Sequence, residues 1–265
     1  YYSGIGTKRN PAKAAELFTQ ASEQGNVEAA VNLAFLYISG SGVEKDSNKA
    51  MNYFIKAANQ GNLTAEYMLG YAYYRGFIVP QNYKKAFELI RNPANAGYDE
   101  AQLVLAQMYL YGEGITKNYG NAVKYLGRSF MQGNVEAITL LADILATGNV
   151  YPKNIYQAHV LYNIASVRGA EHAADNRDAL EKAMKINEIL QAQAEAEAFQ
   201  TKPQDLTTYI RKTFGNNIKA YIDDQLPVQP KKNLTTQTPA AQPTPVYVAP
   251  QQPQPSPTPS APRLL

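Results

Sequence analysis

The sequence of 265 residues contains no cysteine. The protein therefore cannot form a disulfide, present a thiol nucleophile or bind zinc through thiolates. Histidine is nearly absent as well, because His159 and His172 are the only two and lie 13 positions apart. This spacing offers no second ligand at the short separations typical of zinc sites, so we predict neither a metal site nor another cofactor.

Long apolar runs and an excess of charge are also missing. No run reaches the roughly 18 apolar residues that a membrane-spanning helix needs, so no transmembrane segment is predicted. Residues 1–226 carry 22 basic and 22 acidic side chains. A nucleic-acid-binding surface needs a basic stripe that neutralises phosphates, so this balance argues against nucleic acid as a partner.

The feature that is present is a fixed period. Five glycines stand 36 residues apart, at Gly25, Gly61, Gly97, Gly133 and Gly169. Two columns of alanines share the period: Ala29, Ala65, Ala101, Ala137 and Ala173, and Ala14, Ala50, Ala86, Ala122 and Ala158. Such a period indicates stacked repeats, each of which completes its core only against its neighbours.

Each repeat is predicted to form two helices joined by glycine turns. Asn26 is a good N-cap, and apolar residues at helical spacing follow it as far as Tyr37. Asp46 is predicted to cap the second helix, and Gly61 to end it. The capping columns are Asn26, Asn62, Tyr98, Asn134 and Ala170 for the first helices, and Asn10, Asp46, Asn82, Asn118 and Asn154 for the second helices.

The fold is therefore predicted to be all-α, a right-handed α-solenoid over residues 1–172 with an incomplete first copy. Tyr1 falls in the column of Tyr37, so we expect the sequence to be a piece of a longer protein. Pro93 interrupts the second helix of the third copy, where we expect a kink or an early end because proline removes a helical hydrogen bond.

Three further segments follow the repeats. A capping helix is predicted over 173–202, and one or two short helices over 203–226, broken at Gly215 and docked on that cap. Eleven of the 16 prolines lie between Pro227 and Pro262, mixed with Gln, Thr and Ser. Such a composition cannot bury enough apolar surface to offset chain entropy, so we predict that residues 227–265 are disordered.

The columns resemble those of the Sel1-like repeat family, which is related to tetratricopeptide repeats. The resemblance covers about residues 1–200 and is carried by Ala65, Leu69-Gly70 and Tyr73, by Tyr109-Leu110-Tyr111-Gly112-Glu113-Gly114-Ile115, and by Ala50, Tyr53, Ala57-Ala58 and Gly61. It implies a scaffold or adaptor. Many bacterial members work in the periplasm or at the cell envelope, and several are linked to host-cell entry, so the resemblance also implies a periplasmic or secreted location and a role in virulence. In general character the sequence is most similar to the enhanced-entry members.

The relation to tetratricopeptide repeats implies that one face of each first helix lines a concave groove. The columns on that face vary between copies, and the first of them holds Glu28, Thr64, Glu100 and Glu136. Aromatic residues and arginine dominate binding energies, so we expect an exposed partner-binding cluster here. Its predicted members are Phe35, Tyr67, Tyr71, Tyr74, Arg75, Gln107, Tyr111 and Asp143. An alternative stays open, namely that Tyr67 or Tyr74 packs against a neighbouring helix.

The predicted function is non-catalytic binding of a protein or peptide in this groove. No Ser-His-Asp arrangement and no isolated carboxylate pair is visible, so carbohydrate hydrolysis by the repeats is a weak alternative. In a stronger alternative, the convex face or residues 203–226 dock on a periplasmic murein enzyme and regulate or inhibit it. A purely structural array without a partner of its own is a further possibility.

Overall fold

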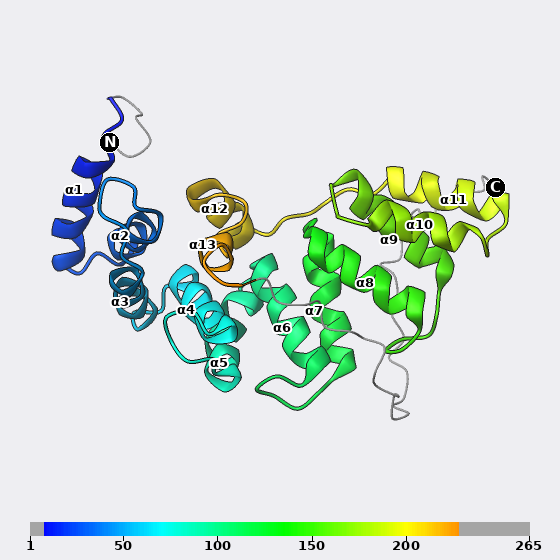
Figure 1. Ribbon diagram of the computed structural model, residues 1–265, viewed down its shortest axis with the longest axis horizontal. Helices are drawn as coiled ribbons and strands as arrows, with labels where there is room; N and C mark the ends of the chain where they lie inside the picture. The colour runs from blue at the N-terminus through cyan, green and yellow to red at the C-terminus, as the bar shows by residue number, and fades with distance from the viewer. Residues whose placement is uncertain (1–7, 228–265) are drawn as a thin grey trace, which may run out of the picture.

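The computed structural model describes residues 8–227, which contain helices and no strand (Figure 1). The first helices of the repeats are α2 (Val27–Ser39), α4 (Leu63–Arg75), α6 (Asp99–Tyr111) and α8 (Val135–Thr147). The second helices are α1 (Pro11–Glu23), α3 (Ser47–Ala58), α5 (Tyr83–Asn95), α7 (Tyr119–Met131) and α9 (Ile155–Val167). From α2 onward, each first helix packs against the second helix that follows it. The all-α array of helix-turn-helix repeats is therefore confirmed.

Side-chain capping fixes where these helices begin. The side-chain oxygens of Asn26, Asn62 and Asn134 accept a backbone N–H three residues later, at 2.8, 3.0 and 3.0 Å. All five second helices have the same bond at their predicted cap. Tyr98 cannot make it, so α6 starts without a side-chain cap of its own. The cap columns are confirmed, and the fourth copy, with α6, is the exception among the first helices α2 to α8.

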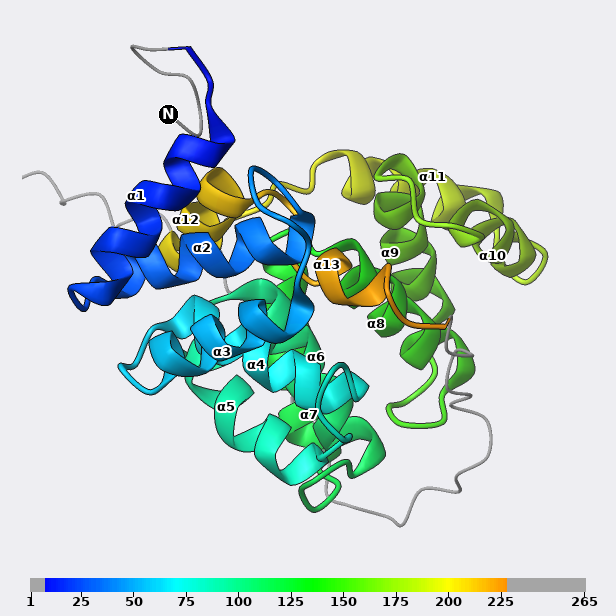
Figure 2. The same ribbon diagram turned by 60° about the vertical axis from the view of Figure 1, so that its left-hand side comes forward.

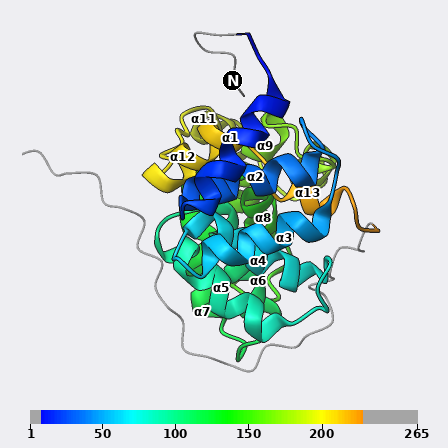
Figure 3. The ribbon, with the colours of Figure 1, turned by 90° about the vertical axis from the view of Figure 1, so that its left-hand side faces the viewer.

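The two alanine columns form the seam of the stack. Within the described residues every member of both columns is buried, with at most 5% of its surface exposed. A methyl side chain lets two helix axes approach closely, and larger neighbours such as Leu33 and Leu105 fill the space beside it. Because these positions recur at one period, successive helix pairs lie behind one another, as the view along the array shows (Figure 3).

The loop between the two helices of a repeat packs against the preceding repeat. Gly114 has a positive φ of 73°, and a Cβ on it would lie 2.3 Å from the carbonyl oxygen of Tyr83 at the start of α5. In the third copy Ile78 occupies the equivalent place and still adopts a φ of 62°. The loop geometry is therefore imposed by stacking, and only glycine adopts it without strain.

The expectation that Pro93 ends α5 early is wrong. The helix runs to Asn95 and has the same 13-residue length as α7. Pro93 lies in the last turn, where its buried ring packs in the core and its carbonyl oxygen accepts the N–H of Tyr98 at 2.9 Å. Pro93 removes one helical N–H donor, but the helix continues past it for two residues.

The predicted capping helix is divided in two, α10 (Ala173–Glu181) and α11 (Ile186–Glu197). The break falls at Lys185, whose backbone is extended and whose N–H is accepted by the Glu188 carboxylate at 2.8 Å. Neither glycine nor proline marks this break in the sequence, so composition could not reveal it.

The segment that follows is helical and is interrupted at Gly215, as predicted, but its predicted docking place is wrong. Its helices are α12 (Asp205–Phe214) and α13 (Ala220–Asp223). They do not dock on α10 and α11. They turn back and lie on the inner side of the arc that the repeats form (Figures 1 and 2). The predicted disordered tail lies outside the described residues, apart from Pro227.

Within residues 8–227, none of the helices combines the length and the apolar character that crossing a membrane requires.

The stacking role of the loop glycines can be tested with a matched pair of substitutions. Gly61 has a similar φ of 78°, but a Cβ on it would meet nothing within 4 Å. Gly61→Ala is expected to cost about 1–2 kcal/mol through backbone strain alone. Gly114→Ala adds a clash with the preceding repeat, so its total cost is about 2–5 kcal/mol. Urea unfolding followed by circular dichroism measures both, and equal losses would contradict close packing at Gly114.

Candidate functional site

The inner face of the array is covered by the chain itself. We use "inner face" for the surface of α2, α4, α6 and α8 on the side where α12 and α13 lie (Figures 1 and 2), and "C-terminal segment" for residues 205–226. Residues 199–204 connect α11 to this segment without regular structure. They are held across the end of α7, where Lys202 N–H donates to the Met131 carbonyl at 2.7 Å and Gln204 N–H donates to the Gln132 side chain at 2.8 Å.

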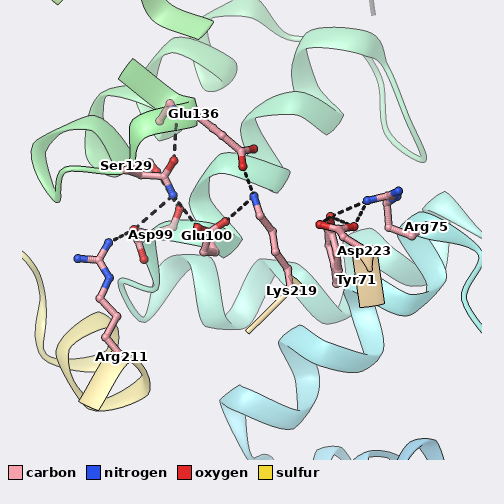
Figure 4. Close-up of polar contacts among 11 residues, drawn as sticks. Tyr71, Arg75, Asp99, Glu100, Ser129, Glu136, Arg211, Lys219 and Asp223 are labelled. Carbon is pink, nitrogen blue, oxygen red and sulfur yellow. Dashed lines mark hydrogen bonds and ion pairs between the residues drawn. The ribbon is translucent and has the colours of Figure 1, made fainter. Parts of the chain in front are cut away.

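The uncapped start of α6 is completed by α12. The Thr207 hydroxyl accepts the N–H of Asp99 at 3.0 Å and donates to the carbonyl of Gly97 at 3.0 Å. Thr207 thus satisfies, from 108 residues away, the first N–H of α6, whereas the asparagines of the other copies bind the third N–H of their helices. Arg211 lies one turn further along α12 and forms an ion pair with the wholly buried carboxylate of Asp99 (Figure 4). A buried carboxylate is costly without such a partner.

A lysine of the C-terminal segment joins two acidic residues of the inner face. Lys219 Nζ lies 2.6 Å from Glu136 Oε1 and 3.0 Å from Glu100 Oε2 (Figure 4). Burial lowers the pKa of Lys219, but the two carboxylates outweigh burial and raise it above its ordinary value. Burial also raises the pKa of Glu100, and Lys219 opposes that rise. At neutral pH the lysine is therefore charged, and it bridges α6 and α8.

The caps of the array hold these acidic side chains in place. The Asn134 amide donates to Glu100 at 3.0 Å, and the Asn62 amide donates to Glu28 at 2.9 Å. Glu28 in turn accepts the Tyr209 hydroxyl of α12 at 2.8 Å. Each of these asparagines therefore begins one helix and orients a carboxylate of the preceding copy, so the acidic positions are ordered by the repeat.

A third polar contact joins α13 to α4. The Tyr71 hydroxyl donates to Asp223 at 2.9 Å and accepts a bond from Arg75 at 3.0 Å, and Arg75 also pairs with Asp223 (Figure 4). Burial raises the pKa of Tyr71 well above its ordinary value, so the phenol is protonated and acts as the donor. In this contact the array provides the cation, Arg75, and the C-terminal segment provides the anion, Asp223.

Apolar contacts accompany the polar ones. The ring of Phe35 lies 4.5 Å from that of Phe214 and 5.4 Å from that of Tyr221, measured between centroids. Ile210, Ile218 and Ile222 are completely buried and belong to the main core of the array. The C-terminal segment is therefore held by the same kinds of contact that hold a bound helical peptide, although it is part of the same chain.

Three predicted site residues lie beneath this segment or beside it, buried. Phe35, Tyr67 and Tyr71 expose 7%, 0% and 5% of their surface. The expectation that they face an open groove is therefore wrong, because the sequence did not reveal what covers them. Tyr67 packs edge-on against the ring of Tyr98 at 4.8 Å, which supports the alternative that it contacts a neighbouring helix.

The other predicted residues are half-buried: Tyr74, Arg75, Gln107, Tyr111 and Asp143. Tyr74 donates to Glu113 at 3.0 Å, and Asp143 accepts the Tyr162 hydroxyl at 2.7 Å. Their side chains are tied into the array but keep some exposed surface. Contact of any of the eight residues with a partner stays a prediction.

Sequence reasoning missed the residues that anchor the C-terminal segment: Asp99, Thr207, Arg211 and Lys219. A signal for one of them was present. Asp99 stands in a column that otherwise holds Val27, Leu63 and Val135, and it follows Tyr98, the residue that replaces the asparagine cap. Two departures side by side mark the place where something other than the next repeat packs on the array.

The histidines lie apart from this site. His159 is buried in α9 with Nε2 3.0 Å from Glu181 Oε1, whereas the His172 side chain is 63% exposed. The part of the chain between residues 8 and 227 contains no group of three or more side chains arranged to hold a metal ion.

Comparisons with known proteins agree with the repeat phase. The family model "Sel1 repeat" matches residues 1–26, 27–62, 63–98, 99–134 and 135–166, so its units begin where α2, α4, α6 and α8 begin. Among solved structures, a Sel1 repeat protein from Oxalobacter formigenes is 26% identical, with a TM-score of 0.61 over 76% of this chain and 84% of that chain.

Two other solved structures are more distant. A protective antigen of uropathogenic Escherichia coli with an SLR fold is 20% identical, with a TM-score of 0.43 over 80% of this chain and 62% of that chain. An immunity protein from Pseudomonas aeruginosa is 22% identical, with a TM-score of 0.42 over 77% of this chain and 81% of that chain. A search of the curated proteins found no match.

Capping of α6 from a distance predicts a specific effect of removing one hydroxyl. Thr207→Val keeps the shape but leaves the buried Asp99 N–H without an acceptor, at an expected cost of about 1–2 kcal/mol. Thr207→Ser keeps the hydroxyl and is expected to lose far less. Thr208→Val, at the exposed neighbouring position, is the control. Unfolding curves and exchange of the Asp99 amide measure the effect. Equal stability of Thr207→Val and Thr208→Val would contradict it.

Proposed function

Because the chain belongs to the Sel1 repeat family, whose members generally act as protein–protein interaction scaffolds, we propose that it binds a protein or peptide partner on its inner face. The observation that supports this proposal is the docked C-terminal segment. The inner face holds it through an aromatic cluster, ion pairs and hydrogen bonds, the mixture found at peptide-binding interfaces. The array therefore has the shape and charge to hold a helical ligand.

We expect the partner to bind next to α13, toward the C-terminal ends of α4, α6 and α8. Tyr74, Gln107, Tyr111 and Asp143 lie on these helices and keep part of their surface exposed. Aromatic and polar side chains of this kind are common at interface hot spots. Binding here uses the fixed spacing of the array helices and includes no catalytic step.

We also propose a location in the bacterial envelope or outside the cell, with a role in contact with host cells. This part rests on the family resemblance. The rival function, regulation of a murein enzyme through residues 203–226, needs that segment to be accessible. Ile210, Ile218 and Ile222 are occupied in the core, so this function would have to use exposed parts of the segment, such as the outer side of α12 with Lys212 and the turn at 215–217.

A photo-crosslinking residue at two positions tests binding on the inner face. A benzophenone side chain at Gln107 is expected to capture one defined protein from the native host, whereas the same probe at Lys124, exposed on α7, is expected to capture none. Tyr111→Ala together with Asp143→Asn should reduce capture at Gln107 at least about five-fold, roughly 1 kcal/mol. Equal capture at both positions, or capture that the two substitutions leave unchanged, would contradict the proposal.

A further inference from the structure

The charges of the C-terminal segment and of the inner face are complementary. Asp99 faces Arg211, and Glu100 and Glu136 face Lys219. Asp99 replaces the apolar residue that Val27, Leu63 and Val135 provide in the other first helices, whereas Glu100 and Glu136 share a column with Glu28 and Thr64. The acidic positions of the inner face therefore match the cations of this segment, as a binding site matches its ligand.

The way the segment is attached differs from the way the repeats are attached to each other. The repeat helices approach closely along their backbones, whereas α12 and α13 make far fewer close backbone approaches to the array. Long side chains carry their contacts instead. The connection through residues 199–204 is irregular, so the segment can leave the inner face without unwinding a repeat helix.

The resident segment also leaves polar groups of the inner face unused. The Tyr67 hydroxyl, Asp99 Oδ1 and Arg75 Nε are buried and have no hydrogen-bond partner within residues 8–227. Tyr67 is fully buried, and the carboxylates of Glu100 and Glu136 act on its pKa, so its hydroxyl lies close to the Lys219 site. A ligand that satisfied these groups would bind this face better than the resident segment does.

We propose that residues 205–226 are a displaceable resident ligand, and that the partner docks a helical segment of the same chemistry in their place. That segment carries two cations, one reaching Asp99 and one reaching Glu100 and Glu136, with an aromatic side chain between them that packs on Phe35. The inference rests on the proposed function in that the partner uses the inner face. The C-terminal segment then occupies the inner face until a partner segment with these two cations and this aromatic side chain replaces it.

A labelled synthetic peptide of residues 203–227, added to the full chain, tests this directly. In the variant Arg211→Glu/Lys219→Glu the chain's own segment is repelled from the inner face, so the peptide is expected to bind at least ten-fold tighter than to the wild-type chain. Lys212→Glu makes the same charge change at an exposed position of α12 and should bind like wild type. Equal affinity for the double variant and the wild-type chain would overturn the proposal.

Native-state hydrogen exchange of the unmodified chain gives a second test that needs no variant to fold. Amides of α12 and α13 are expected to exchange at least ten-fold faster than those of α4 and α6, through an opening that leaves the array intact. Exchange of both sets at one rate, with one denaturant dependence, would show that the segment is a fixed part of the core and would overturn the proposal. A dimer formed by exchange of the segment between two copies, detected by sedimentation, would make a second copy of this chain the occupant and would overturn the proposed partner segment.

Both tests use only this chain and its own peptide. If the segment proved to be fixed, the proposal of a displaceable ligand would be rejected, while the expected crosslinking at Gln107 would be unaffected. A mobile segment without crosslinking at Gln107 would reject the proposed function, so the two failures are distinguishable.

Discussion

The docking of the C-terminal segment depends on how the start of α6 is completed. This helix has no side-chain cap of its own, and its first residue, Asp99, is a carboxylate with no exposed surface. The positive end of the helix dipole favours an acid there, but a buried acid still needs a partner. Thr207 accepts the first N–H of the helix, and Arg211 supplies the opposite charge. The N-terminus of α6, in the fourth copy, is therefore fully paired only when the C-terminal segment, or a ligand of the same chemistry, lies on it.

The rest of the inner face follows from the same arrangement. Once α12 is anchored at α6, the irregular turn after Gly215 brings Lys219 between Glu100 and Glu136 and brings Asp223 to Arg75. The alanine seams keep the first helices at a constant spacing, so the acidic positions of successive copies lie at fixed distances from each other. A regular stack with irregular inner positions is a suitable frame for selecting one ligand.

The repeat itself could be predicted from the sequence because its signals are local. Asn26 and Asp46 cap helices through bonds to residues three positions later, and the alanine seam recurs with the period. The position of residues 203–226 could not be predicted, because their partners are 70 or more residues away and no period relates them. Their amphipathic pattern predicted helices but not the surface they cover, and for this reason the burial of Phe35 and Tyr71 was missed.

The departures from the repeat pattern pointed to contacts that the sequence analysis did not predict. Tyr98 and Asp99 break two columns at adjacent positions. Asp99 binds Thr207 and Arg211 of the C-terminal segment, and Tyr98 packs against the buried ring of Tyr67. By contrast, no residue type at Lys185 signals the break in the predicted capping helix. The helix restarts there because the Glu188 carboxylate, three residues later, accepts the Lys185 N–H. Here two adjacent departures, Tyr98 and Asp99, mark a contact outside the stack, whereas a single departure such as Ile78 does not.

The central claim is that residues 205–226 lie on the inner face, and a distance measurement in solution tests it most directly. The absence of cysteine allows spin labels to be placed at two chosen positions, Lys212 on α12 and Glu88 on α5, both exposed. Double electron–electron resonance is predicted to give one narrow distance distribution, which Arg211→Glu/Lys219→Glu broadens. A broad distribution in the wild-type chain, unchanged by these substitutions, would contradict the account.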